Sequence, residues 1–305
     1  MTYHFAPDGA SFAVESTSRL DAFVAARSFD KPTLVMDLDL VEAQYRALRR
    51  GLGRADIHYA VKANPARQII ARLVDLGSHF DAASRAEIAL CLEEGAQPSE
   101  VSFGNTIKRA SDIAWAWEQG ITLFAADAEE ELEKIAVNAP GASVYIRLIV
   151  EVSEADWPLS RKFGCDRDTA LNLLDQAKAL GLNPVGFSFH VGSQTRHAAM
   201  WAPTLDAMAL IWKAANDAGH DLSLLNIGGG FPAFYGEEIE TPTAYAAEVI
   251  AMVETRFPNV PRIMAEPGRG MVAEAGVIVA EVMLVSRKSD RDLHRWVYLD
   301  IGRFS

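Results

Sequence analysis

The sequence predicts an α/β protein built around a closed, TIM-like (β/α)8 barrel. From Thr33 onward, short runs of β-branched and aromatic residues alternate with longer stretches rich in Ala, Leu, Glu and Arg, which is the pattern of a parallel sheet covered by helices. Half of the 305 residues are hydrophobic, which is enough for a large core. Nine strand candidates occur, and a barrel needs eight within roughly 250 residues. In chain order they are TLVMDL, IHYAVK, HFDAAS, VSFGN, LFAADA, SVYIRLIV, VGFSFHV, LLNIGGG and RIMAEPG.

The barrel is expected to span residues 33–270. We take TLVMDL as a lead-in strand, IHYAVK as the first barrel strand and RIMAEPG as the eighth. Between strands, Ser84 and Glu87 form a capping-box pattern and Gly95 ends the helix that follows. The pairs Asp39 with Glu42 and Asp127 with Glu130 predict helix starts of the same kind.

The two ends of the chain lie outside this pattern. Residues 271–305 contain strand signals without helical segments between them, and residues 1–32 precede the barrel. We therefore expect a second, β-rich domain built from both ends. Because Ser305 directly follows a strand signal, we expect this domain, and the recorded chain, to be incomplete at the C-terminus.

Composition excludes several classes of protein. The 29 Lys and Arg residues against 41 Asp and Glu give a formal net charge of −12, which argues against binding nucleic acid or anionic membranes and slightly favours small cationic ligands. The sequence has neither a signal-peptide pattern nor an apolar run of about 18 residues. Cys91 and Cys165 have neither disulfide-framework nor metal-ligand spacing, so we expect small buried thiols, no metal and a cytoplasmic location.

Residues at the C-terminal ends of the predicted strands form the candidate active site, because barrels of this kind place their chemistry there. Each residue alone has an ordinary structural explanation. Their combination on one rim, with a lysine, an imidazole, carboxylates and glycine loops, favours an active site. The strand-end residues are Lys62, Asp81, Arg147, His190, Gly228, Gly229, Gly230, Glu266 and Arg269.

Two glycine-rich loops predict a phosphate site. GGGFP and EPGRG follow the seventh and eighth strands, where barrels often bind phosphate. Glycines allow backbone N–H groups to approach an anion, and Arg269 adds a charged donor. Neither loop matches a nucleotide-binding motif, so an organic phosphate on a small cofactor fits better.

Lys62 indicates which cofactor this is. It ends an apolar strand at the barrel mouth and is followed by Asn64 and Pro65. A lysine in that position can have its pKa lowered and form a Schiff base. Together with a phosphate site, it predicts pyridoxal 5′-phosphate, with Glu266 at the ring nitrogen.

The chain resembles a known family through motifs that occur in order along its length. These are YAVKAN, FDAAS, LSRKFG at 159–164, FHVGSQ, NIGGGFP and EPGRG. They resemble the fold-type III pyridoxal-phosphate decarboxylases of basic amino acids, which have an alanine racemase-like barrel. HVGSQ, GGGFP, EPGRGMVAEAG and WVYLDIGRF look most like the bacterial ornithine or lysine/ornithine decarboxylases.

The resemblance implies a role for each site residue. Lys62 would carry the cofactor, His190 would lie over one face of its ring, and Glu266 would pair with the ring nitrogen. Asp300 would bind the distal ammonium of the substrate. The cofactor-binding set comprises Lys62, Asp81, Arg147, His190, Ser193, Gly229, Gly230, Glu266, Gly268 and Arg269. The family's cysteine, acid and tyrosine from the following tail have no counterpart up to Ser305.

The implied reaction is decarboxylation of L-ornithine to putrescine, or also of L-lysine to cadaverine, in polyamine biosynthesis. The family resemblance further implies a cytoplasmic homodimer with shared active sites. Three alternatives stay open: a diaminopimelate or arginine decarboxylase, a racemase, and a non-catalytic pyridoxal-phosphate-binding regulator if 305 residues is the natural length.

Overall fold

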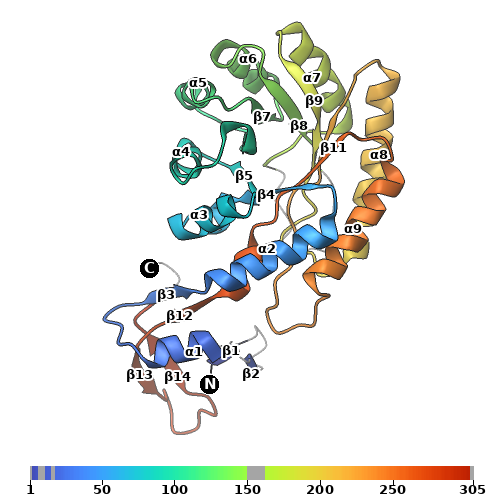
Figure 1. Cartoon of the computed structure of the whole chain (residues 1–305). Coiled ribbons are helices and arrows are strands. Elements are labelled where there is room, and N and C mark those ends of the chain that lie inside the picture. The colour runs from blue at the N-terminus through green and yellow to red at the C-terminus, as the bar shows by residue number, and fades with distance from the viewer. Residues whose placement is uncertain (1, 6–10, 15–17, 150–161, 303–305) are drawn as a thin grey trace.

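Eight parallel strands close into a barrel in the computed structural model, which describes residues 2–5, 11–14, 18–149 and 162–302 (Figure 1). The strands pair in chain order, and β11 closes the ring by pairing with β4. The predicted barrel, with IHYAVK first and RIMAEPG last, is confirmed. The strands are β4 Asp56–Ala60, β5 His79–Ala82, β6 Val101–Phe103, β7 Leu123–Ala126, β8 Ser143–Arg147, β9 Asn183–Ser188, β10 Leu224–Asn226 and β11 Arg262–Ala265.

Side chains along the strands alternate between two cores. In β8, Val144 and Ile146 belong to the large core under the helices, whereas Tyr145 between them belongs to a small cluster inside the barrel. Ala125, Leu224 and Met264 complete that inner cluster. This alternation follows from the two-residue period of a strand.

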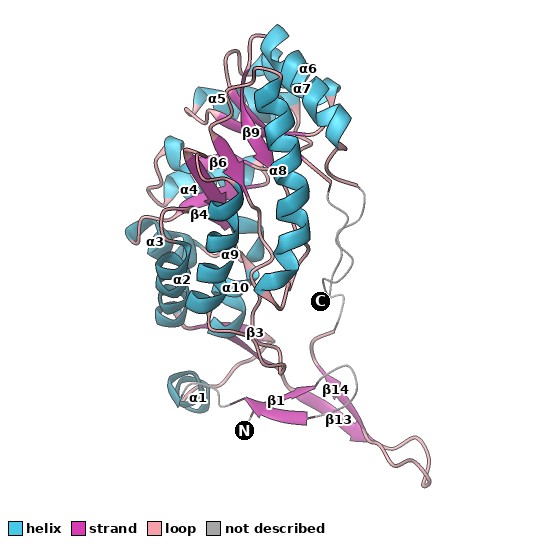
Figure 2. Cartoon of the chain, turned by 90° about the vertical axis from the view of Figure 1, so that its right-hand side faces the viewer, coloured by secondary structure: helices cyan, strands magenta, loops and turns pink. Residues whose placement is uncertain are grey.

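Helices surround the barrel (Figures 1 and 2). The α-helices are α2 Leu38–Leu52, α3 Arg67–Asp75, α4 Arg85–Glu93, α5 Ala110–Glu118, α6 Glu129–Asn138, α7 Arg167–Ala179, α8 Ala202–Asp217, α9 Pro242–Arg256 and α10 Arg269–Val272, with α1 Ser18–Ala25 outside the barrel. Short 3-10 helices are η1 Val61–Ala63, η2 Pro98–Glu100, η3 Ala198–Trp201 and η4 Ala273–Ala275. None of the helices described is long and apolar enough to cross a membrane.

Three two-stranded antiparallel sheets lie outside the barrel. One joins β1 Thr2–Phe5 to β2 Ser11–Val14, and another joins β13 Val282–Ser286 to β14 Trp296–Leu299. The third joins β3 Thr33–Met36 to β12 Gly276–Val279. Strand-rich structure is therefore present near both ends of the described chain, in separate sheets. β3 lies within the range expected for the barrel but pairs only with β12 among the described strands.

Helices begin beside both Asp39 and Asp127, at Leu38 and Glu129, but neither carboxylate is the helix cap that the sequence predicts. Ser84 does cap α4, accepting a hydrogen bond from the Glu87 N–H, and Gly95 follows the helix end at a φ of 102°. However, α2 is capped by Asp37, while Asp39 forms ion pairs with Arg19 and Arg72. Asp127 likewise accepts from the N–H of Gly164 rather than capping α6. Both carboxylates instead bind groups that are distant in the sequence, so they do not cap the nearby helices.

Both cysteines are buried and free, as expected. Burial raises the pKa of the Cys91 and Cys165 thiols to about 12, so neither is a reactive thiolate.

We predict that Gly51→Ala destabilises the barrel. Gly51 lies where α2 packs on α9, and an added Cβ would lie 2.4 Å from the carbonyl oxygen of Thr243 and 2.7 Å from Cβ of Ala246. At a free helix position this substitution would stabilise by roughly 1 kcal/mol. Here we expect overpacking to lower the free energy of unfolding by about 1–3 kcal/mol in urea denaturation.

Arg50→Ala, on the exposed neighbouring position of α2, is the control and should change stability by less than about 0.5 kcal/mol. A Gly51→Ala protein more stable than the parent chain would contradict the close helix contact.

Candidate active site

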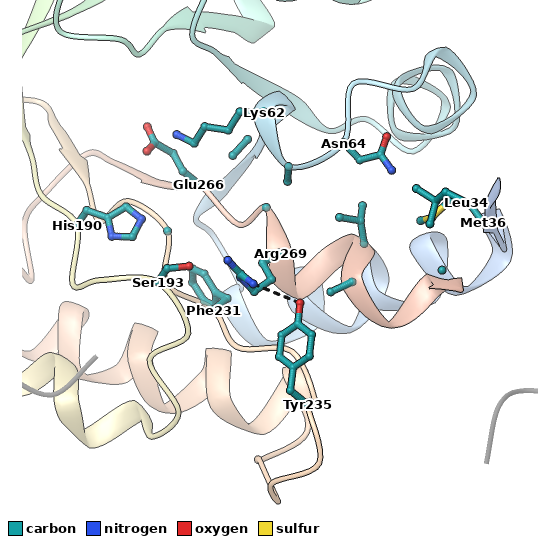
Figure 3. Close-up of a pocket in the computed structure, with 18 of the residues that line it drawn as sticks. Leu34, Met36, Lys62, Asn64, His190, Ser193, Phe231, Tyr235, Glu266 and Arg269 are labelled. Carbon is teal, nitrogen blue, oxygen red and sulfur yellow. Dashed lines mark hydrogen bonds between the residues drawn. The ribbon is translucent and has the colours of Figure 1, made fainter. Parts of the chain in front are cut away.

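A cavity of about 560 Å³ opens at the C-terminal ends of the barrel strands (Figure 3). Most of the residues nominated from the sequence line it: Lys62, His190, Ser193, Gly229, Gly230, Glu266, Gly268 and Arg269. The topology explains this convergence, because parallel strands deliver all their C-terminal ends to one rim.

Lys62 follows β4 in η1 and pairs with Asp81 at the end of β5. The Nζ of Lys62 is 3.5 Å from Oδ2 of Asp81, whose side chain is 4% exposed. A Cβ on Gly104 would lie only 1.8 Å from Oδ1 of Asp81, so the loop after β6 needs glycine to admit the carboxylate. Asp81 thus lies behind the cavity and orients the lysine.

The pKa of Lys62 is raised, contrary to the lowered pKa that the sequence suggests. The charge of Asp81 is the largest cause; burial acts in the opposite direction, and Glu266 adds to the rise. The side chain is 59% exposed to the cavity, so loss of solvent does not outweigh these two carboxylates. In the cofactor-free chain, Lys62 is therefore an ammonium group.

Glu266 follows β11 and points toward Lys62 (Figure 3). Loss of solvent, together with the charge of Asp81, raises the pKa of Glu266 to about 7. The side-chain amide of Asn226, at the end of β10, donates to Oε1 of Glu266 at 2.5 Å. That amide is itself oriented, because its oxygen accepts from the N–H of Gly228 at 2.9 Å. Glu266 is consequently held in one position and poised between its two protonation states.

His190 provides a neutral ring. Burial, together with the charges of Arg147 and Lys62, lowers the pKa of His190 to about 3. Its Nδ1 accepts a hydrogen bond from the N–H of Gly192 at 3.0 Å, which assigns the ring proton to Nε2. A Cβ on Gly229 would lie 3.1 Å from that nitrogen. The glycine keeps one edge of the imidazole open to the cavity.

The glycine loops fit a phosphate group. Gly230 has a φ of 113°, and a Cβ there would lie 2.7 Å from the Gly192 carbonyl oxygen. Within the described part of the chain, the N–H groups of Gly229 and Gly230 donate to no protein acceptor. With Ser193 and Arg269 at the same cavity, these donors form an anion-binding nest. The residues present therefore fit pyridoxal phosphate, with its phosphate here and its ring near Lys62 and Glu266.

Four nominated residues do not line the cavity: Asp81 and Arg147 affect its residues through their charges, Gly228 directly precedes the lining glycines, and Asp300 is separate. Asp81 pairs with Lys62, and Arg147 influences Lys62 and His190 through its charge. Asp300 accepts from the N–H of Glu281 at 2.8 Å and does not line the cavity. The 159–161 part of LSRKFG and the Phe304 end of WVYLDIGRF lie outside the described residues.

Sequence reasoning missed several residues of the site. Asn226 precedes the nominated glycine run. Its position at the end of a strand is the signal that could have identified it. Tyr235 and the β3–β12 residues Leu34, Met36 and Ile278 carry no local signal, yet they line the cavity. They reach it through loop and sheet geometry that the strand pattern does not contain.

Comparisons with known proteins agree with this site. The family model for the pyridoxal-binding domain of pyridoxal-dependent decarboxylases matches residues 38–273. The lysine/ornithine decarboxylase of Selenomonas ruminantium is 35% identical over 278 residues, which cover 91% of this chain and 70% of that protein. The chain spans between 57% and 70% of the length of the curated relatives it matches.

Solved structures are similar over most of the chain. The structure of SrLDC with PLP and cadaverine superposes with a TM-score of 0.83 at 32% identity, covering 94% of this chain and 72% of that one. The arginine decarboxylase of Paramecium bursaria Chlorella virus, bound to agmatine, gives a TM-score of 0.81 at 29% identity, covering 90% of this chain and 73% of that one.

We predict that Glu266→Gln makes the cofactor-free protein relatively more stable as pH rises. In the folded chain the pKa of Glu266 is about 7, above the ordinary glutamate pKa of 4.5, so folding favours its protonated form. The stability from this proton is present below about pH 4.5 and is lost as pH rises to about 7. Glutamine cannot ionise, so the stability difference between variant and parent should grow across this range and level off above it.

The measurement is denaturant unfolding at several pH values. Glu133→Gln, exposed on α6, is the control and should give a difference independent of pH. A constant difference for Glu266→Gln would mean that Glu266 ionises in the folded chain as it does in the unfolded one.

Proposed function

The chain belongs to the family of pyridoxal-dependent decarboxylases, and we propose that it removes the α-carboxylate of a basic amino acid, converting L-ornithine to putrescine and also L-lysine to cadaverine. The observation that carries the proposal is the meeting of Lys62, Glu266 and a phosphate-type nest in one cavity. The cofactor is pyridoxal phosphate.

Pyridoxal phosphate, when bound, supplies an electron sink for the carbon that loses CO2. Lys62 is the residue that would hold it, through Nζ. Because Asp81 stabilises the ammonium form of Lys62, Nζ carries a proton whenever it is not attached to the cofactor. Nζ would lose that proton on attachment, and once released it would be able to take up a proton again and donate it to the substrate.

Glu266 would hold a proton at the ring nitrogen. An ionised carboxylate next to a protonated ring is favoured by its charge, and the Asn226 amide fixes the oxygen that accepts. An acidic residue in this position strengthens the electron sink. This supports decarboxylation over the racemase alternative, in which an arginine typically meets the ring nitrogen.

His190 would cover one face of the ring without adding charge. With a pKa of about 3 the imidazole stays neutral across the working range of pH, so it does not repel a protonated ring. Packing a flat, uncharged ring there excludes water from the reacting centre.

The substrate class rests on the relatives and on charge. The relatives named above act on basic amino acids by their names, and the chain's formal net charge of −12 favours a cationic substrate. We propose Asp300 as the contact for the distal ammonium. Because Asp300 does not line the cavity of its own chain, that role requires a second subunit or a movement of the β13–β14 sheet.

We further propose a cytoplasmic homodimer acting in polyamine biosynthesis. Exposed apolar side chains on the β13–β14 sheet support a subunit contact, among them Val282, Met283 and Trp296. Size-exclusion chromatography with light scattering tests the dimer, and a mass equal to one chain at micromolar concentration would overturn it.

We predict CO2 release from L-ornithine and L-lysine when the protein is supplied with pyridoxal phosphate. The assay compares these two with L-arginine and meso-diaminopimelate, each carboxyl-labelled. Lys62→Ala should release no CO2 because it lacks the attachment amine. Glu266→Gln should retain the cofactor but release CO2 at least about ten-fold more slowly, a loss of roughly 1.4 kcal/mol of transition-state stabilisation.

Release only from L-arginine or meso-diaminopimelate would keep the decarboxylase and change the substrate. Retained cofactor without CO2 from any of the four would overturn the enzymatic proposal and favour the non-catalytic regulator.

A further inference from the structure

Tyr235 is a cavity residue that the proposed reaction does not use. It lies in the loop between β10 and α9 and lines the cavity with Ser193, Gly230 and Arg269 (Figure 3). Its hydroxyl oxygen is 3.3 Å from Nη1 of Arg269, which donates to it. The side chain is 46% exposed, so the cavity leaves room for a ligand beside it.

The pairing with Arg269 leaves the tyrosine proton available. A phenol both accepts and donates a hydrogen bond, whereas a guanidinium only donates. Since the oxygen of Tyr235 accepts from Arg269, its O–H can donate to a third group. Donors side by side, one of them charged, match an anion better than any neutral or cationic group.

The loop that carries Tyr235 is fixed just before this residue. The side-chain amide of Gln194 donates to the carbonyl of Ala233 and accepts from its N–H at 3.1 Å. The next N–H, of Phe234, donates to Oε1 of Glu274 at 3.0 Å. The backbone directly before Tyr235 is therefore held in place by hydrogen bonds.

Gln194 connects this loop to the proposed phosphate nest. It follows Ser193 directly, is 5% exposed, and has a φ of 60°, the only positive φ of a non-glycine residue in the described chain. Such strain persists only where surrounding contacts hold it. The same residue thus positions Ser193 on one side and the Tyr235 loop on the other.

Charge at the nest favours an additional ligand. Among the described residues lining the cavity, the cations are Lys62 and Arg269, and Lys62 is engaged by Asp81. A phosphate dianion there would meet Arg269 and backbone N–H groups. A hydroxyl donor next to Arg269 extends the nest on its outer side.

We propose that the Tyr235 hydroxyl is a further ligand of the cofactor's phosphate group, acting as a second donor beside Arg269. This inference rests on the cofactor site described above and deepens the proposed function. It does not depend on which amino acid is decarboxylated, or on whether CO2 is released.

The test measures dissociation constants for pyridoxal phosphate and for pyridoxal, which lacks the phosphate, by absorbance of the bound ligand. Tyr235→Phe removes only the hydroxyl. We expect it to weaken pyridoxal phosphate about ten-fold, the size of one hydrogen bond to a charged group, and to change pyridoxal less than two-fold. Inorganic phosphate, measured by its competition with pyridoxal phosphate, should bind the parent chain more weakly than the cofactor does. Its affinity should fall further in Tyr235→Phe.

Tyr298→Phe is the matched control, because Tyr298 is an exposed tyrosine on β14 that also packs beside a cation, Lys288, but does not line the cavity. It should leave both dissociation constants unchanged. Equal weakening of pyridoxal and pyridoxal phosphate by Tyr235→Phe would overturn the proposal, as would no weakening of either. A raised KM for the amino acid at unchanged cofactor affinity would assign the hydroxyl to the substrate carboxylate and overturn it too.

If the variant binds pyridoxal phosphate less tightly but the parent releases no CO2, the phosphate ligand stands and the decarboxylase proposal fails. If the parent releases CO2 and the variant binds the cofactor normally, the decarboxylase proposal stands and the proposal that Tyr235 binds the phosphate fails.

Discussion

The charge balance between Lys62 and two carboxylates is the interaction on which this site depends. Asp81, with almost no solvent exposure, keeps Lys62 protonated, and the pKa of Glu266 rises to about 7 partly because Asp81 is charged. Removing Asp81 or Lys62 would shift the pKa of Glu266, and removing either carboxylate would lower the pKa of Lys62. A cofactor with an aldehyde for the lysine and a basic ring nitrogen for the glutamate completes this arrangement, since it gives each group a partner.

The barrel explains why residues far apart in the sequence meet here. Lys62, His190 and Glu266 could be predicted because each follows a recognisable apolar strand, and closed parallel topology brings all such strand ends to one rim. The two glycine loops were predictable for the same reason. Once the strands are recognised, the barrel topology therefore indicates which residues lie at the site.

Other features depend on tertiary contacts that no local pattern contains. Asp39 resembles a helix cap but pairs with arginines from other elements, and the pKa of Lys62 rises because β5 places Asp81 beside it. Tyr235 reaches the cavity because Gln194, strained and distant in sequence, pins its loop. Asp300 is the opposite case, because a sequence motif nominated it but it does not line the cavity of its own chain.

The attachment point of the cofactor tests the central claim most directly. The protein is loaded with pyridoxal phosphate, reduced with borohydride, digested and mapped by mass spectrometry. We expect a single modified lysine, Lys62, and its loss from the map when inorganic phosphate and a carbonyl scavenger are present before reduction. Modification of a different lysine, or uniform labelling of surface lysines with Lys62 unmodified, would contradict it.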